Sequence, residues 1–357
     1  MRRGGAGRGG AGLRAAAALW LLRGARPVPR PRLPRAPARL GPGAGGQVRA
    51  PRRMAVAVVV LRLLVCLLAS PLFLLHALGL WSQICKRWWF PHFLARFSVM
   101  YNERMAGRKR ELFGSLQAFA GPSGRLSLLE VGCGTGANFQ FYPPGCRVTC
   151  VDPNPNFEKF LIKSIAENRH LQFERFVVAA GEDMPQVADG SVDVVVCTLV
   201  LCSVRDQGQI LREVCRVLRP GGAFFFLEHV AAESSTWNYF WQQILHPFWH
   251  LLFDRCHLTR ESWKALERVP FSQLKLQHFQ APLSWELVRP HISGRGVCGS
   301  SANLHAFRGQ GQLERSSLFL HKLQPKFWTE SQLAQIDNTG SKSMPAPVTV
   351  FNPDGSC

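Results

Sequence analysis

The stretch "LLEVGCGTG", residues Leu128 to Gly136, decides the fold class of this chain. An apolar run leads into three alternate glycines, Gly132, Gly134 and Gly136, and Glu130 stands two residues before the first of them. An apolar run bounded by turn residues is typical of a buried strand that ends in a tight turn. Glycines in such a turn let a ligand approach the backbone closely. The stretch therefore predicts a ligand-binding loop at the carboxyl end of a buried strand.

Strand and helix patterns alternate beyond this loop, which predicts an α/β fold built on a parallel sheet. Helices are expected near 136–141, 156–168, 206–218 and 236–253. Strands are expected at 126–131, 147–151, 174–178, 192–197 and 222–228, followed by one near 272–280 and another that starts near 286.

The glycine loop alone leaves the cofactor class open. A dinucleotide fingerprint also fits, through Gly132, Gly134 and Ala137, with Asp152 twenty residues after the first glycine for a ribose. Neighbouring features decide between a dinucleotide and a cofactor with a cationic amino-acid end. Glu130 suits a cofactor with a cationic amino-acid end better than an anionic pyrophosphate, and Asp152 ends the second strand, where a carboxylate can accept both ribose hydroxyls. The segment "LREVCRVLRPGGAFFFLEH" adds an amphipathic helix, a turn and a buried strand.

The motifs at 130–136, Asp152, "DGSVDVVVC" and "RVLRPGG" together resemble the class I S-adenosylmethionine-dependent methyltransferases. The resemblance implies a Rossmann-like, seven-stranded sheet in which only the last strand is antiparallel, and S-adenosyl-L-methionine as cofactor. More closely, residues 54–292 are similar to the membrane-anchored thiol S-methyltransferases of the methyltransferase-like seven group, through segments such as "NERMAGRKRELF" and "HVAAESSTWNYFWQQ". That likeness implies methyl transfer to small lipophilic thiols.

The resemblance also implies roles for single residues. Glu130 would meet the methionine ammonium through the glycine loop, with Gly132, Gly134 and Gly136 as the backbone cradle. Asp152 would take the ribose hydroxyls, Pro153 would lie against the adenine, and Thr198 would lie near the sulfonium. Many relatives carry an acid after the third strand for the adenine amino group, but Ala180 aligns there in this chain. We therefore expect Glu182 or Asp183 to substitute for it.

A strong base is optional for this reaction, because a thiol is already a few per cent thiolate at neutral pH. If the enzyme uses one, His229 is the candidate, since "FLEHV" puts it at the carboxyl end of the fifth strand. The alternative is a histidine that only caps that strand.

The aromatic stretch Thr236–Asp254 is the candidate substrate lid, and an ordinary packing helix is the alternative. His246 and His250 have the spacing of metal ligands, but Pro247 lies between them and the Glu of the H-E-x-x-H motif is missing. We therefore expect no metal site.

An uncharged, apolar segment at 63–85 predicts a membrane anchor within 54–90, followed by a helical linker at 91–125. Lys86, Arg87 and the aromatic run 88–90 resemble an interfacial belt, which places the following domain on the cytosolic side. Pro71 interrupts the segment, so a span and a re-entrant hairpin both remain open. The expected location is the cytosolic face of the endoplasmic reticulum membrane, with lipid droplets as a further destination.

The net charge of +20 is concentrated near the N-terminus. Residues 1–53 hold thirteen Arg and no acid, which leaves +7 elsewhere, so we expect no nucleic-acid partner. The Pro- and Gly-rich composition of 1–53 predicts a disordered extension, and Met54 resembles a natural start. Eleven cysteines without a CxxC pair predict reduced core thiols. Nothing in the sequence indicates an obligate protein partner.

The chain departs from its relatives near His291, where "HISGRGVCGSS" replaces an apolar alternation. We expect this change to end the methyltransferase domain, 126–292, before its last strand and to leave 293–357 as an irregular tail. The loss of a strand from the sheet interior predicts a less stable, inactive form. Two functional alternatives therefore stay open: methylation of another lipophilic acceptor, such as a quinol, lipid or arsenical, and a non-catalytic membrane-anchored scaffold.

Overall fold

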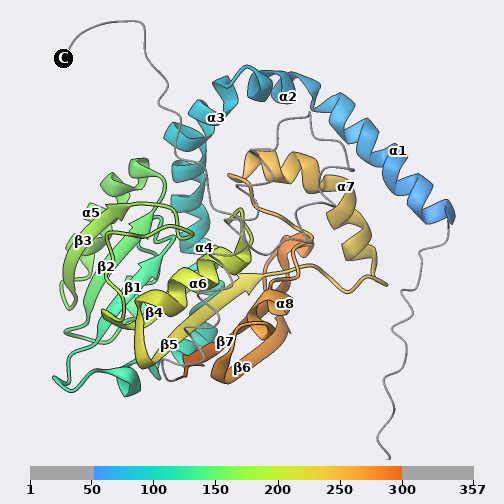
Figure 1. Ribbon diagram of the computed structural model, residues 1–357. Coiled ribbons are helices and arrows are strands. Elements are labelled where there is room, and N and C mark those ends of the chain that lie inside the picture. Colours follow the sequence, from blue (N-terminus) through green and yellow to red (C-terminus); the bar gives the residue numbers. More distant parts are fainter. Residues whose placement is uncertain (1–51, 300–357) are drawn as a thin grey trace, which may run out of the picture. The chain divides into compact units, whose positions relative to one another are not determined.

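The computed structural model describes residues 52–299, with side chains from residue 55 onward (Figure 1). The expectations for residues 1–51 and 300–357 lie outside this range. The described chain forms a seven-stranded sheet of order β3-β2-β1-β4-β5-β7-β6. The strands are β1 (Ser127–Val131), β2 (Arg147–Asp152), β3 (Gln172–Val178), β4 (Val192–Thr198), β5 (Leu218–His229), β6 (Phe271–Gln280) and β7 (Pro290–Cys298).

Only β7 runs antiparallel to its neighbours, β5 and β6, while β3, β2, β1, β4 and β5 pair in parallel. The expected Rossmann-like, seven-stranded sheet is therefore confirmed. The central strand β4 is buried along nearly its whole length, which explains its sequence "VDVVVC", apolar except for Asp193.

Helices cover both faces of the sheet. The amphipathic helix α6 (Gln207–Val217) packs Ile210 and Val214 on one face, together with Leu266 of the short helix α8 (Ser262–Glu267), which the sequence analysis missed. Phe113 of α4 (Phe90–Phe113) and Leu161 of α5 (Glu158–Glu167) pack on the other face.

The expected helix at 136–141 is wrong, because the chain forms only a short 3-10 turn, Phe139–Phe141. Gly132, Gly134 and Gly136 all have positive φ angles, and two prolines follow at 143–144. A regular helix cannot form here, because every second residue is left-handed and a proline pair follows. The loop cannot therefore rely on a helix dipole for binding.

The expected loss of the last strand after Ile292 is also wrong. β7 continues to Cys298 and is paired on both sides, for example Phe226 with Gly294 and Leu276 with Gly294. A Cβ atom at Gly294 would lie 1.9 Å from the Lys275 carbonyl oxygen, and one at Gly296 would lie 2.8 Å from the Phe271 ring. The glycines thus fit a tightly packed strand, and the two ladders of hydrogen bonds override their weak strand propensity.

The N-terminal segment folds as α1 (Arg52–Leu68), α2 (Ser70–Ala77), α3 (Leu80–Ile84) and a π-helical turn (Cys85–Trp89) that leads into α4. Within residues 52–299 no single helix has the length and apolar composition to cross a membrane, but the pair Ala55–Leu68 and Ser70–Ala77, bent by 69°, passes on those two criteria. α1 packs against α7 (Trp237–Leu252) (Figure 1).

Trp89 of the predicted interfacial belt, and Trp81 in the apolar segment before it, make intramolecular contacts. The indole N–H groups of Trp81 and Trp89 donate to the carbonyl oxygens of Leu251 and Leu252 at the end of α7, at 2.9 and 3.0 Å. Trp88 remains exposed. These bonds attach the N-terminal helices to the end of α7.

Candidate active site

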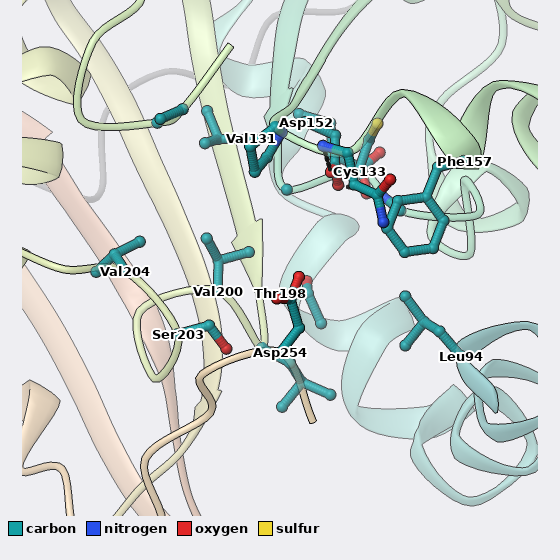
Figure 2. Close-up of a pocket in the computed structure, with 18 of the residues that line it drawn as sticks. Leu94, Val131, Cys133, Asp152, Phe157, Thr198, Val200, Ser203, Val204 and Asp254 are labelled. Atoms are coloured by element: carbon teal, nitrogen blue, oxygen red, sulfur yellow. Dashed lines mark hydrogen bonds between the residues drawn. The ribbon is translucent and has the colours of Figure 1, made fainter. Parts of the chain in front are cut away.

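A cavity of about 640 Å³ opens at the carboxyl ends of β1, β2 and β4. Asp152 and Thr198 reach it from two of these strands, and Leu94 reaches it from α4 (Figure 2). Parallel sheets bind ligands at this edge, where the strand order reverses. Here the reversal lies between β1 and β4, directly beside the glycine loop.

The glycine loop forms one wall of the cavity. Gly132 and Gly134 line it, with φ angles of 66° and 50°. A Cβ at Gly132 would come within 2.5 Å of Val200, so a larger residue does not fit. Gly136 lies behind the wall, where a Cβ would meet Ser164 and Phe139. Two of the three predicted cradle glycines therefore face the cavity, and the third packs against the protein.

Asp152 ends β2 and is almost fully buried. Its Oδ2 accepts the Gly134 N–H at 3.0 Å, and its Oδ1 accepts the Asn154 N–H at 2.9 Å. Burial raises the pKa of this carboxyl to about 6, and the two N–H donors oppose the shift. Each oxygen keeps acceptor capacity, so the carboxylate can still bind two hydroxyl groups.

Glu130 lies at the end of β1, where burial raises its pKa to about 7. Its Oε1 accepts the Asn138 side-chain N–H at 2.8 Å, and the same amide donates to Thr198 Oγ1 at 3.1 Å. By distance and angle Oε2 makes no hydrogen bond to the described residues, although the Tyr142 hydroxyl interacts with this carboxylate and lowers its pKa. An acceptor with spare capacity in the cavity wall is suited to a ligand ammonium group.

Lys109 of α4 is a site residue that the sequence analysis missed. Its ammonium donates to Asn102 Oδ1 at 2.6 Å and to Asn138 Oδ1 at 2.7 Å, and it lines the cavity. Burial lowers the pKa of Lys109 to about 7, and the charge of Glu130 opposes this shift. Lys109 lies within "NERMAGRKRELF", a segment that carries the family likeness, but that likeness assigned it no role.

The remaining predicted cofactor residues also line the cavity: Pro153, Thr198, and both Glu182 and Asp183. Ala180, where relatives carry an acid, lines it too. Glu182 Oε1 accepts the backbone N–H of Arg205 at 2.7 Å. Glu182 therefore ties the loop after β3 to the loop after β4.

The apolar wall of the cavity comes from α4 rather than from α7. Phe90, Leu94 and Phe97 of α4 line it, whereas no residue of α7 does. Of the predicted lid stretch Thr236–Asp254, only Asp254 lines the cavity. The helix itself docks through the buried Gln242, whose amide donates to the Leu287 carbonyl oxygen at 2.7 Å. The segment expected to be a linker is thus part of the site.

His229 is not part of the cavity wall. It ends β5, is buried, and contacts Cys256, with 2.9 Å between Nε2 and Sγ. Its predicted role as the base is therefore not supported by the geometry. The preceding Glu228 accepts the N–H groups of Val200 and Leu201, each at 3.1 Å, which fixes the turn at the end of β4.

The donor set fits S-adenosylmethionine. Glu130 Oε2 can accept from an ammonium, Asp152 can accept from ribose hydroxyls, and Gly132 and Gly134 leave the backbone open to a close approach. Lys109 adds a positive charge for a carboxylate. A cofactor with an amino-acid end and a nucleoside end therefore matches both ends of the cavity.

Comparison with known proteins agrees with this reading. A family model described as "Methyltransferase domain" matches residues 129–226. The human thiol S-methyltransferase TMT1A is 79% identical over 244 residues, which are 68% of this chain and all of that protein. Human thiol S-methyltransferase TMT1B is 57% identical over the same shares of the two chains.

Among solved structures, a geranyl diphosphate methyltransferase in complex with SAM aligns with 56% of this chain and 88% of its own, at 15% identity and a TM-score of 0.41. The similarity of sequence is what carries the assignment. This chain belongs to the TMT1 group of class I S-adenosylmethionine-dependent methyltransferases.

Proposed function

We propose that the chain transfers the methyl group of S-adenosylmethionine to small lipophilic thiols. The observation that carries this proposal is one cavity with two kinds of wall: Glu130 and Asp152 at the strand ends, and Phe90, Leu94 and Phe97 on α4. The relatives' names as thiol S-methyltransferases support the thiol as acceptor.

The bound cofactor supplies a methyl group that its sulfonium already activates for direct displacement. The protein's task is therefore alignment, which can contribute about 7–11 kcal/mol. Asp152 and Glu130 would hold the two ends of the cofactor, and Lys109, which also lines the cavity, would supply a positive charge for its carboxylate. A thiol with a pKa of ~8.5 is already a few per cent ionised at neutral pH, so the reaction needs no strong base.

The α4 wall supports a lipophilic acceptor. An alkyl tail packed against Leu94 and Phe97 leaves water, which contributes about 0.8 kcal/mol for each methylene group. Each added methylene should thus raise kcat/KM about fourfold until the wall is filled.

The test is calorimetric titration of detergent-solubilised full-length protein with S-adenosylhomocysteine, followed by methyl transfer to a series of alkyl thiols. Leu94→Asn should weaken the chain-length dependence, whereas Val99→Asn, on the exposed side of α4, should not. Binding without turnover on any thiol would overturn the choice of acceptor. A folded protein that binds no cofactor would overturn the enzymatic function.

We further propose that the protein works at the cytosolic face of the endoplasmic reticulum membrane. Exposed apolar side chains on the bent pair α1–α2 support this proposal: Val59, Val60, Leu63, Leu64, Leu67, Leu68 and Leu74. A bend of 69° favours a re-entrant segment over a straight span. Exposed Trp237 on the neighbouring helix α7 is a residue type enriched at membrane interfaces.

Flotation with phosphatidylcholine vesicles tests the membrane proposal. The wild-type chain should float, and a variant with Leu63→Asp, Leu67→Asp and Leu74→Asp should stay in solution. Ile162→Asp, an equally exposed apolar residue on α5, is the matched control. If the triple variant floats like the wild type, these helices are not the anchor.

A further inference from the structure

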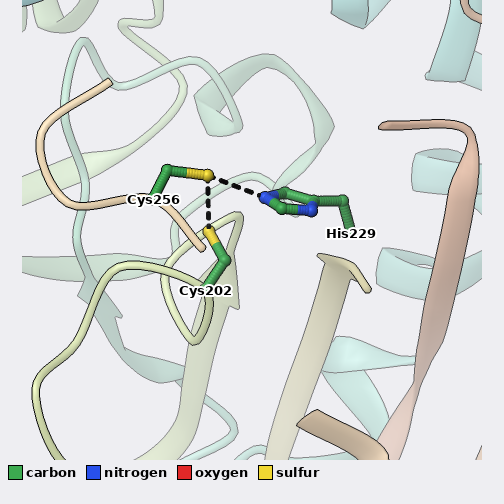
Figure 3. A group of neighbouring side chains, drawn as sticks. All are labelled: Cys202, His229 and Cys256. Atoms are coloured by element: carbon green, nitrogen blue, oxygen red, sulfur yellow. Dashed lines mark hydrogen bonds between the residues drawn. The ribbon is translucent and has the colours of Figure 1, made fainter. Parts of the chain in front are cut away.

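Three soft ligands meet outside the cavity: Cys202 from the turn after β4, His229 from the end of β5, and Cys256 from the segment after α7 (Figure 3). All three are buried, and their ligand atoms lie within 4.8 Å of one another. The residues come from separate parts of the chain, so the sequence alone gives no spacing motif for them. This explains why the sequence analysis expected no metal site.

The distances match a metal site better than a disulfide. The sulfur atoms of Cys202 and Cys256 are 3.7 Å apart, far beyond the ~2.05 Å of a disulfide bond. Two thiolates bound at ~2.3 Å in a tetrahedral arrangement lie close to the observed separation. The Cys256 sulfur is 2.9 Å from Nε2 of His229, so one ion can reach all three atoms after a small adjustment.

We infer that Cys202, His229 and Cys256 bind one thiophilic d10 metal ion, Zn²⁺ or Cu⁺. Sulfur and imidazole ligands are the preferred set for these ions. Each thiol gives up its proton as the ion binds, so two thiolates neutralise a divalent ion inside the protein. With Cu⁺ one negative charge remains, and Arg260, which interacts electrostatically with both cysteines, offsets it.

The surroundings provide one second-shell donor, Trp249. The indole N–H of Trp249 donates to the Cys256 sulfur at 3.2 Å, which favours a thiolate there. His229 Nδ1 has no hydrogen-bond partner among the described residues, so Nε2 carries the only polar contact of this ring. No fourth His, Cys, Asp or Glu joins the group within residues 52–299.

An ion bound outside the cavity would hold two segments that contribute residues to the cavity wall. Ser203, next to Cys202, and Arg255, next to Cys256, both line the cavity. The Cys202 sulfur lies 3.5 Å from Ser203 Oγ. The metal would thus join the turn after β4 to the segment after α7 and hold both in register, which is a positioning role.

The test is metal analysis of the full-length protein purified in detergent under reducing, oxygen-free conditions. After chelation, Zn²⁺ and Cu⁺ are added separately, and bound metal is measured by mass spectrometry after gel filtration. About one ion per chain should remain. Co²⁺ added to the metal-free wild-type protein should give the near-ultraviolet absorption band of a thiolate complex. The thermal midpoint should rise on loading.

Cys202→Ala, Cys256→Ala and His229→Ala should each lower the affinity by more than the ~10–100-fold that the loss of a second-shell partner costs. Cys298→Ala is the matched control, because its sulfur lies 3.6 Å from that of Cys215 in another buried pair that joins no metal-ligand group within the described residues. The proposal is overturned if the wild-type protein retains neither ion and gives no Co²⁺ band, or if binding survives in all three variants. None of these readouts depends on methyl transfer.

Discussion

Asp152 accepts the backbone N–H of Gly134 at 3.0 Å, so the acid at the end of β2 holds the glycine loop that follows β1. The Asp152 carboxylate therefore holds the glycine loop and also lines the cavity. It connects the glycine loop with the acid at the end of β2, the two motifs that predicted the cofactor, so Asp152 is the most informative position to change.

Asp152→Ala should weaken S-adenosylhomocysteine binding at least tenfold, because each lost hydrogen bond to a charged group costs about 1.5–3 kcal/mol. Calorimetric titration measures the loss. Asp193→Ala is the control, since Asp193 is also a buried acid in the sheet but binds the Ser127 N–H and Arg219 away from the cavity. That variant should lose stability and keep its affinity. Equal losses of affinity in both variants would argue against the ribose role.

The affinity for S-adenosylhomocysteine should rise between pH 6 and pH 7. Burial raises the pKa of Glu130 to about 7 in the free protein, and an ammonium ligand favours the ionised carboxylate. Below pH 7 binding must therefore release a proton, which costs up to about tenfold in affinity per pH unit. Asp152, with a pKa of about 6, adds to the rise only at lower pH.

Above pH 7 the affinity should fall again as Lys109, whose pKa burial lowers to about 7, loses its charge. Glu130→Gln should remove the rise between pH 6 and pH 7 and move the fall to lower pH, because the Glu130 charge no longer raises the pKa of Lys109. If the rise persists in that variant, another group controls it.

Lys109→Met tests the carboxylate contact. The variant should bind S-adenosylhomocysteine about tenfold or more weakly, because it loses a charge-assisted contact worth about 1.5–3 kcal/mol. Its affinity for methylthioadenosine, which lacks the amino-acid end, should change little. Isothermal titration with both ligands separates the two cases. Equal losses for both would mean that Lys109 acts only through its bonds to Asn102 and Asn138.

Gly134→Ala should mainly lower ligand affinity, and Gly136→Ala should mainly lower stability. Each puts a Cβ on a left-handed backbone, at a cost of about 1–2 kcal/mol. At Gly134 the new methyl reaches Leu94 in the cavity wall, so ligand affinity should fall. At Gly136 it reaches Ser164 and Phe139, so mainly the melting temperature should fall. Gly145→Ala, with a positive φ but open space, measures the strain alone.

Gly294→Ala should destabilise the protein by about 1–3 kcal/mol, since its Cβ would lie 1.9 Å from the Lys275 carbonyl oxygen inside the sheet. Thermal unfolding should show a decrease of about 2–12 °C. Gly299→Ala, whose Cβ would make an ordinary contact at 3.7 Å, should change little. If both variants melt like the wild type, β7 is not paired as described.

The sequence by itself determined the parallel sheet and most of the cofactor residues. Buried parallel strands need long apolar runs, and a turn between such strands and a ligand needs glycine, so Leu128–Gly136 and Asp152 carry a readable local signal. The helix expected at 136–141 failed because three left-handed glycines and a proline pair outweigh the pattern of apolar residues.

Only the tertiary structure decided the rest. β7 forms despite its poor local sequence because two neighbouring strands supply its hydrogen bonds. Lys109 on α4 lines the cavity because α4 packs against the sheet. His229 lies beside Cys202 and Cys256 instead of in the cavity, because folding brings these distant segments together. Hydrogen-bond partners and buried contacts between residues far apart in the chain leave no periodicity in the sequence, so only the folded chain reveals them.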